Sequence, residues 1–211
     1  MIIAVDGPAA SGKGTLAQGL ARQFRLPHLD TGLLYRAVGT AVAGAVEQPD
    51  FEARAIAAAE RLDPTHLDSA GLGTAEAALL ASRVARIPEV RAALRAFQRQ
   101  FASQPGGAVL DGRDIGTRIC PDADVKLFIT ADTRVRAARR TAQLRAKGLA
   151  VDGEAIFRQI AARDENDRTN PAGAFYPAAD AHLLDTTELD IDAALRAAIA
   201  IVEAARTGRA R

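Results

Sequence analysis

The sequence predicts an α/β fold in which helices flank a parallel sheet. Short apolar runs alternate with helical patterns along the chain, and such runs are typical of strands buried on both faces of a parallel sheet. A glycine-rich turn joins the first run to the first helix. The stretch 31–104 contains no convincing strand, so we expect it to be a mostly helical insertion at one edge of the sheet.

The first strand and the first helix are predicted on either side of the glycine-rich turn. Residues 2–5 are a continuous apolar run, and Pro27 ends the helical pattern that follows the turn. A short second strand is expected at 28–29. Thr31 can then cap a helix over about 32–45, because its hydroxyl can accept from the free N–H groups of a first turn.

The second half of the chain contains three further predicted strands and three helices. A clear break at 104–107 precedes them. In order, the expected elements are a strand at 108–111, a strand at 125–130, a helix from Asp132 to about Lys147, a helix from about Asp152, a strand at 183–184 and a helix over 189–205.

The 211 residues fit a single domain. Within it, we expect a core made of 1–30, 105–147 and 170–211. The helical insertion over about 31–104 and a small lid over about 145–170 are expected to attach to this core.

Composition limits the classes of protein to which the chain can belong. No apolar run approaches the roughly 18 residues of a membrane span, and the N-terminus lacks the pattern of a signal peptide. The formal net charge is only +1, which argues against a protein that coats nucleic acid. Cys120 is the only cysteine, so no internal disulfide can form. We therefore expect a cytoplasmic monomer with no membrane and no nucleic-acid partner.

The strongest motif is the glycine-rich turn itself, because it lies between a buried strand and a helix, as a P-loop requires. Glycines let backbone N–H groups surround phosphate oxygens, and the helix adds its positive dipole end. Lys13 follows Gly12 at the required spacing from Gly7 and is one of only three lysines, which argues against a simple glycine turn. The residues expected to bind ATP are Gly7, Pro8, Ala9, Ala10, Ser11, Gly12, Lys13, Gly14 and Thr15.

The general motif has Ser or Thr directly after the lysine, where the hydroxyl meets Mg²⁺. Here that position is Gly14, and the hydroxyl arrives one residue later, at Thr15. This displacement implies a magnesium ion that keeps several of its waters. A buried strand also delivers Asp111 near the loop. We therefore expect Thr15 and Asp111 to hold Mg²⁺ through water.

Two further constellations follow predicted strands, at the carboxyl edge of the sheet where ligands bind in open α/β folds. In LDTGLLYR, Arg36 can chelate a phosphate with two parallel bonds, and Tyr35 offers a flat face and a hydroxyl. In DGRDIGT, Arg113 and Asp114 follow a glycine at a strand end. The alternatives are a surface arginine at a helix start and a pair of charges that neutralise each other.

The third constellation is the arginine-rich stretch 134–168. Arg136, Arg139 and Arg140 lie on about one face of a predicted helix, and Arg163 and Asp167 are an i, i+4 pair on the next helix. Only three of the 27 basic residues are lysines, so arginines are common throughout the chain. Two interpretations therefore stay open, a solvated helix face and a lid whose arginines lie over a transferred phosphoryl group.

Together these motifs resemble bacterial cytidylate kinases over nearly the whole chain. The combination is specific, because kinases for other acceptors share the loop without the rest. The matching segments are GPAASGKGT at 7–15, LDTGLLYR at 29–36, TAEAALLASRVARIPEVR at 74–91, DGRDIGT at 111–117, RDENDR at 163–168 and PAADA at 177–181.

The resemblance implies a role for each of these side chains. Ser82, Arg91 and Asp114 would read the cytosine ring. The implied substrate-binding residues are Thr31, Tyr35, Arg36, Ser82, Arg91, Arg113, Asp114, Arg163 and Asp167. The implied catalytic residues are Lys13, Arg113, Arg139, Arg140 and Arg163.

The implied reaction is transfer of the γ-phosphoryl group of ATP to CMP, and also to dCMP, with Mg²⁺. The N4 amino group of cytosine can donate to Asp114, whereas uracil would place an oxygen there. An unpaired buried polar group costs about 1–3 kcal/mol, which favours CMP over UMP by about 5- to 150-fold. The alternatives are a kinase for UMP or AMP and a non-enzymatic nucleotide switch.

The chain departs from the family pattern at two places. Asn170 stands where many relatives have an arginine, three residues after Asp167. We therefore expect weaker acceptor binding or a different sugar contact. The region 48–73 is also shorter than usual and lacks the alternating strand pattern of the family's insert.

Overall fold

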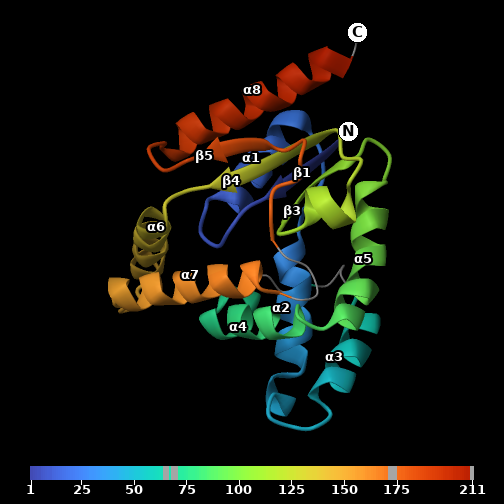
Figure 1. Ribbon diagram of the computed structural model, residues 1–211, viewed down its shortest axis with the longest axis vertical. Helices are drawn as coiled ribbons and strands as arrows, with labels where there is room; N and C mark the ends of the chain where they lie inside the picture. Colours follow the sequence, from blue (N-terminus) through green and yellow to red (C-terminus); the bar gives the residue numbers. More distant parts are fainter. Residues whose placement is uncertain (64–66, 68–70, 171–174, 210–211) are drawn as a thin grey trace.

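The computed structural model describes residues 1–63, 67, 71–170 and 175–209 and confirms the predicted α/β fold (Figure 1). Within these residues, five strands form a parallel sheet in the order β2-β3-β1-β4-β5. The first strand of the chain therefore lies at the centre of the sheet. The strands are β1 (Ile2–Asp6), β2 (His28–Asp30), β3 (Ala108–Gly112), β4 (Val125–Thr130) and β5 (His182–Asp185).

Helices cover both faces of the sheet, and successive residues of the central strand point to opposite sides. Ile3 and Val5 pack in one cluster with residues of α1 and α8. Ala4 belongs to a second cluster, which includes Ile115 and residues of α5. Both sides of β1 are therefore buried, which explains its continuous apolar sequence. The flanking helices are α1 (Lys13–Phe24), α5 (Pro88–Ala102) and α8 (Ile191–Arg209).

The predicted insertion is helical and has a hydrophobic core of its own (Figure 1). Gly39 lets α2 approach α4, because a Cβ atom on Gly39 would lie 2.8 Å from the Leu80 Cβ atom. In the described part of 48–73, the chain forms α3 and short turns and no strand. The elements before α5 are α2 (Thr31–Ala41), a 3₁₀ turn (Ala43–Ala45), α3 (Phe51–Glu60), a 3₁₀ turn (Gly71–Gly73) and α4 (Ala75–Val84).

Two helices, α6 (Thr133–Ala146) and α7 (Gly153–Arg168), form a hairpin beside the end of the sheet (Figure 1). Their predicted starts are confirmed. Asp132 accepts from two N–H groups of the first turn of α6, and Asp152 does the same for α7. The movement of this hairpin as a lid stays a prediction.

The predicted cap of α2 was wrong by one residue. The Asp30 side chain accepts from the backbone N–H of Gly32 at 2.9 Å, and Thr31 is the first helical residue. Aspartate and threonine are both good caps, so composition could not decide between them. The helix also ends at Ala41 rather than near residue 45, where a 3₁₀ turn follows.

Two other elements differ from the predictions. Helix α1 ends at Phe24, ahead of Pro27, because Arg25 adopts a left-handed conformation with φ +54°. A π-helical turn (Ile115–Ile119) after β3 had not been predicted. None of the helices in the described ranges is long and apolar enough to cross a membrane.

Gly39→Ala is expected to destabilise the fold, because the new Cβ atom would meet the backbone of α4. Overpacking of this kind costs about 1–3 kcal/mol, which exceeds the gain of about 0.5–1 kcal/mol that alanine brings to a helix. Gly44→Ala is the matched control, since no atom lies within 4 Å of its Cβ position. Urea unfolding followed by circular dichroism measures both variants, and equal stabilities would contradict this packing.

Candidate functional site

The phosphate loop (residues 7–15) takes its shape from packing on β4 and from left-handed residues. A Cβ atom on Gly7 would lie 2.2 Å from the carbonyl oxygen of Ile129, so this position requires glycine. Gly12, directly before α1, has φ +89°. Ala10 has φ +59°, a strained conformation for a residue with a side chain. The surrounding structure therefore holds the loop in a conformation that it would not favour alone.

Lys13 begins α1 and bends back over the phosphate loop. Its ammonium group donates to the carbonyl oxygen of Pro8 across an N–O distance of 3.4 Å. Burial lowers the pKa of Lys13 to about 7, and the charge of Arg113 adds to this shift. A phosphate group at the loop would favour the charged form again, because it supplies a nearby negative charge.

Two carboxylates lie beside the phosphate loop, at the ends of β2 and β3. One oxygen of Asp111 hydrogen-bonds with His28 Nε2 at 2.8 Å, and the other lies 3.6 Å from the Cβ position of Gly14. Burial, and then the charge of Asp111, raises the pKa of Asp30. The hydroxyl of Thr31 donates to the backbone carbonyl of Asp111 at 2.8 Å. Thr31 therefore joins α2 to β3.

Arg113 connects the phosphate loop to α7. Its Nη1 atom donates to the carbonyl oxygen of Gly7 at 2.8 Å, and its Nε atom donates to Asp167 Oδ2 at 2.6 Å. The guanidinium also lies over the ring of Phe175, 5.6 Å from its centroid. The structure thus brings Arg113 and Asp167, predicted from separate motifs, into direct contact.

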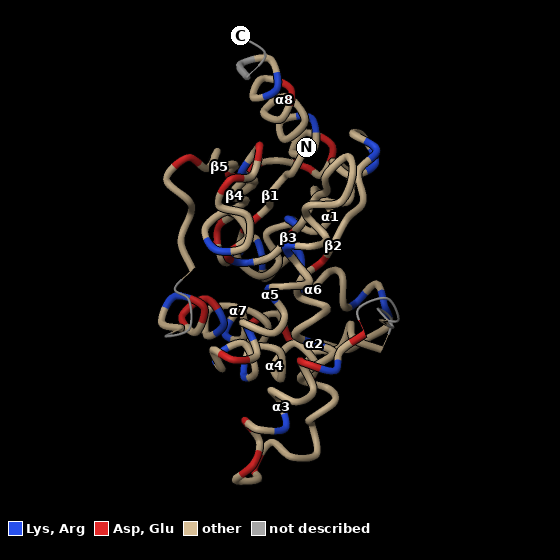
Figure 2. Tube along the Cα trace, turned by 90° about the vertical axis from the view of Figure 1, so that its right-hand side faces the viewer, with Lys and Arg blue, Asp and Glu red and all other residues tan. Residues whose placement is uncertain are grey.

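Several cations gather at this end of the sheet and repel one another. Burial lowers the pKa of Arg163 to about 10, and the charges of Arg113 and Arg36 add to the shift. Burial and Arg36 also lower the pKa of Arg140. Figure 2 shows Lys and Arg positions in the region between the sheet and α7. We call Lys13, Arg36, Arg113, Arg140 and Arg163 the cation group.

The cation group has an unsatisfied donor as well as excess charge. Within the described ranges, the buried Nε atom of Arg163 has no hydrogen-bond partner. Buried donors and like charges are both unfavourable unless an acceptor or an opposite charge arrives. A ligand with several negative charges would meet both needs.

Tyr35, Arg91 and Asp114 meet where α2, α5 and the segment after β3 come together. Arg91 and Asp114 form a buried ion pair through Nη2 and Oδ2. The Arg91 guanidinium lies 5.9 Å from the centroid of the Tyr35 ring. Burial raises the pKa of Tyr35. The buried Nε atom of Arg91 has no partner in the described part of the chain, so this group also retains a free donor.

Two of the predicted site residues make their bonds outside the cation group. The Ser82 hydroxyl donates to the carbonyl oxygen of Ala78, one turn earlier in α4, at 3.1 Å. Arg139 donates to the hydroxyl and the carbonyl oxygen of Thr186 at 3.0 and 2.6 Å. A third bond from Arg139 reaches the carbonyl of Leu189 at 3.2 Å. Arg139 thus fixes the segment after β5 to α6, and its catalytic role stays a prediction.

Asn170 joins the segment after α7 to the helical insertion. Its side-chain amide donates to the carbonyl oxygen of Ala85, which directly follows α4, at 3.3 Å. The residue that departs from the family pattern therefore has a structural contact.

Sequence reasoning missed one buried charged residue near the site, Asp6, and grouped the buried Arg136 with Arg139 and Arg140 without predicting its contacts. Asp6 ends β1 and accepts from the N–H groups of Ile115 and Gly116 at 2.9 and 2.8 Å. Burial raises the pKa of Asp6 to about 6. Asp6 therefore holds the π-helical turn that follows Asp114. An aspartate at the end of an apolar strand was the signal that could have identified it.

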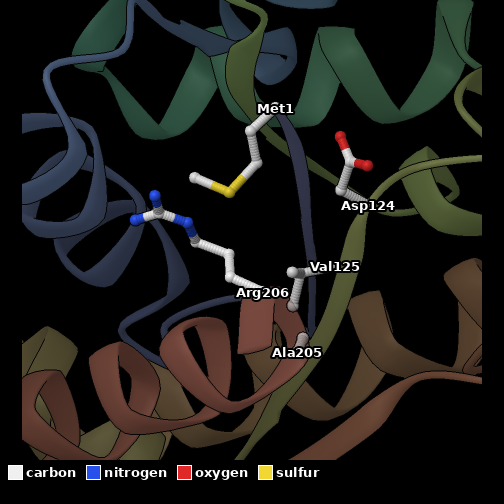
Figure 3. A pocket seen from close by; sticks show the side chains of 5 residues that line it. All are labelled: Met1, Asp124, Val125, Ala205 and Arg206. Atoms are coloured by element: carbon white, nitrogen blue, oxygen red, sulfur yellow. The ribbon is translucent and has the colours of Figure 1, made fainter. Parts of the chain in front are cut away.

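A surface pocket at the opposite edge of the sheet is separate from this site (Figure 3). It lies at the beginnings of β1 and β4, whereas the phosphate loop follows the end of β1. None of the predicted site residues lines it. The lining residues are Met1, Asp124, Val125, Ala205 and Arg206.

The parallel sheet, the glycine loop after its central strand and the lysine at the start of α1 define a P-loop phosphotransferase. The family model described as cytidylate kinase matches residues 3–204. A cytidylate kinase of Nitrobacter winogradskyi is 56% identical and covers 100% of both chains. One of Methylocella silvestris is 56% identical over 97% of this chain and 95% of that protein. The chain belongs to the cytidylate kinase family and is a nucleoside monophosphate kinase.

The fold also recurs in more distant proteins. The crystal structure of an uncharacterized protein from Eubacterium ventriosum aligns with a TM-score of 0.56 over 96% of this chain and 98% of that one. The two sequences are only 16% identical. This likeness supports the α/β architecture and carries no argument about the substrate.

ATP binding is expected to take up protons above pH 7. In the free protein the pKa of Lys13 is about 7 instead of its ordinary 10.5, so the side chain is largely neutral between these values. Bound phosphates favour the ammonium form, so the complex holds more protons and ATP affinity falls as pH rises through this window. Calorimetry in buffers of different ionisation enthalpy measures the uptake. Lys13→Arg stays charged and should abolish it, and unchanged uptake in this variant would contradict the assignment.

Proposed function

We propose that this chain transfers the γ-phosphoryl group of ATP to CMP, with dCMP as a second acceptor. The observation that supports the proposal is the cation group, which adjoins both the phosphate loop and the Arg91–Asp114 pair. Arg113 bonds to the phosphate loop and directly precedes Asp114, which pairs with Arg91. Membership of the cytidylate kinase family supports CMP as the acceptor.

The phosphate loop is the proposed donor site. Its backbone N–H groups and the positive end of α1 are suited to the phosphates of ATP. Lys13 adds a charge at the β- and γ-phosphates, and the strained Ala10 indicates that the loop is held ready for a ligand.

The Arg91–Asp114 pair is the proposed acceptor-base site. A carboxylate has two oxygens and about four acceptor positions, so Asp114 can bond to Arg91 and still accept from the N4 amino group of cytosine. The unpartnered Nε atom of Arg91 is suited to an acceptor atom of the same ring. Tyr35 supplies an aromatic face beside them. Arg36 and Arg163 are the proposed ligands of the CMP phosphate.

Mg²⁺ is the proposed metal, and the donors beside the phosphate loop fit it. Asp111 and Asp30 supply carboxylate oxygens next to Lys13, and the exposed residue Thr15 supplies a hydroxyl. Oxygen donors are the ligands that this hard cation prefers. Thr15 and Asp111 would hold the ion through its waters. When bound, Mg²⁺ neutralises charge on the β- and γ-phosphates.

Catalysis in this proposal consists of positioning and charge neutralisation. The CMP phosphate is already an oxyanion, so no side chain has to remove a proton from the nucleophile. Arg113 and Arg163 neutralise the charge that spreads over the transferred group. Helix α7 lies next to the phosphate loop through the Arg113–Asp167 pair, and its closure excludes water that would otherwise hydrolyse ATP.

A panel of acceptors tests the proposed substrate. CMP is expected to exceed UMP in kcat/KM by about 5- to 150-fold, because uracil leaves Asp114 without a donor. AMP and GMP should be poorer still, and ATP hydrolysis without an acceptor should be slow. A coupled assay of ADP release measures all of these. Faster turnover of AMP or UMP would favour a different kinase, and hydrolysis that ignores the acceptor would favour a nucleotide switch.

Arg113→Ala is expected to reduce phosphoryl transfer by about 10³-fold or more, because it removes a charge next to the transferred group. ATP affinity should change little, since Lys13 and the loop amides remain. Arg168→Ala is the matched control on α7, because its side chain is 73% exposed and bonds only to Glu165 in the described contacts. Stopped-flow kinetics and calorimetry give the two quantities. Loss of ATP binding in Arg113→Ala would refute this division of roles.

A further inference from the structure

We propose that Arg136 is a positioning residue that fastens the acceptor-side helix α7 to the phosphate loop and thereby couples the two nucleotide sites. The inference rests on the proposed function, since it assumes a donor nucleotide at the loop and CMP beside α7. Arg136 does not belong to the cation group and is not expected to touch either nucleotide. Its side chain is 4% exposed.

Arg136 first ties α6 to the phosphate loop. Its Nη1 atom donates to the carbonyl oxygen of Ala9 at 3.0 Å, and its Nε atom donates to the carbonyl of Ala131 at 2.8 Å. The Ala9 carbonyl belongs to the peptide bond that leads into Ala10, the strained residue of the loop. A donor fixed at this carbonyl therefore helps to hold the strained conformation.

The same guanidinium holds α7. Its Nη1 and Nη2 atoms donate to Oδ1 and Oδ2 of Asp164 at 3.1 and 2.6 Å, which is a two-bond fork. Asp164 directly follows Arg163 and lies one turn before Asp167. Both neighbours are proposed acceptor ligands. A fork fixes direction as well as distance, so it sets how α7 presents these two side chains.

A second ion pair between α6 and α7 differs from the Arg136–Asp164 pair in its exposure to solvent. Arg134 Nη1 lies 3.6 Å from Glu154 Oε1, and these side chains are 72% and 65% exposed. An exposed ion pair of this kind contributes little to stability and does not fix how the two helices lie. The Arg136–Asp164 pair is largely buried and also reaches the loop. Buried pairs of this kind fix an arrangement more than they add stability.

Coupling between the two sites follows from these bonds. A donor nucleotide that orders the loop fixes the position of the Ala9 carbonyl. Because Arg136 bonds to this carbonyl and to Asp164, it then fixes the position of α7 as well. CMP should then bind to a helix that is already in place. Linkage requires the converse as well, so CMP should strengthen donor binding by the same factor.

The test compares CMP affinity in the presence and absence of a non-hydrolysable ATP analogue, by calorimetry on the full chain. In the wild type, the analogue is expected to tighten CMP binding by about 5- to 150-fold. Arg136→Lys keeps the charge but loses the two-bond fork. The factor by which the analogue tightens CMP binding should therefore fall towards one. Its kcat should fall about 100-fold, because small misplacement of reacting groups has this effect. Its affinity for CMP alone should change less than the coupling.

Asp164→Asn is the second variant, because it keeps the shape of the side chain and removes the opposite charge. It should lose coupling in the same way, and it decides the question if Arg136→Lys does not fold. Arg134→Lys is the matched control and should keep both coupling and kcat. Circular dichroism confirms folding of each variant.

Three results would overturn the inference. The wild type could show no coupling, a folded Arg136→Lys or Asp164→Asn variant could keep wild-type coupling and kcat, or Arg134→Lys could lose both to the same degree. In each case CMP would still be phosphorylated by the wild type, so the proposed function would stand. If the wild type does not phosphorylate CMP, the proposed function itself is wrong, and the acceptor panel detects this separately.

Discussion

Repulsion between like charges is the constraint around which the ligand-binding end of this molecule is organised. Burial lowers the pKa of both Lys13 and Arg163, and the charge of Arg113 lowers both further, with little water to screen it. Such a group is unfavourable by itself and becomes favourable when phosphates enter. The free energy of the empty site is therefore high relative to that of the occupied site. Ligands that lack several negative charges do not gain binding energy from this difference.

The rest of the fold keeps these charges apart and in place. Carbonyl oxygens and carboxylates from distant segments hold them, as Gly7 and Asp167 hold Arg113. The parallel sheet makes this possible, because the carboxyl ends of β1, β2 and β3 meet at one edge and deliver Asp6, Asp30 and Asp111 there. Acidic residues at the strand ends and basic residues on the helices thus form one electrostatic unit.

The sequence was sufficient for features that depend on local spacing. The five strands and the phosphate loop were predicted, because apolar runs and the Gly7-to-Lys13 spacing are complete within a few residues. Features that depend on remote contacts could not be predicted. The π-helical turn is held by Asp6, which lies 109 residues before Ile115 in the chain. Helical spacing groups Arg136 with Arg139 and Arg140, but it could not show that Arg136 is buried against Asp164 while Arg134 is exposed.

The central place of β1 has a consequence for how the chain acquires its structure. This strand is synthesised before its partners β3 and β4, which pair with it through residues 108–112 and 125–128. Neither edge of β1 can therefore pair until these later residues have left the ribosome. The insertion has its own hydrophobic core and depends less on residues that come later. The phosphate loop, which follows β1, is thus made before the strands that complete its native surroundings.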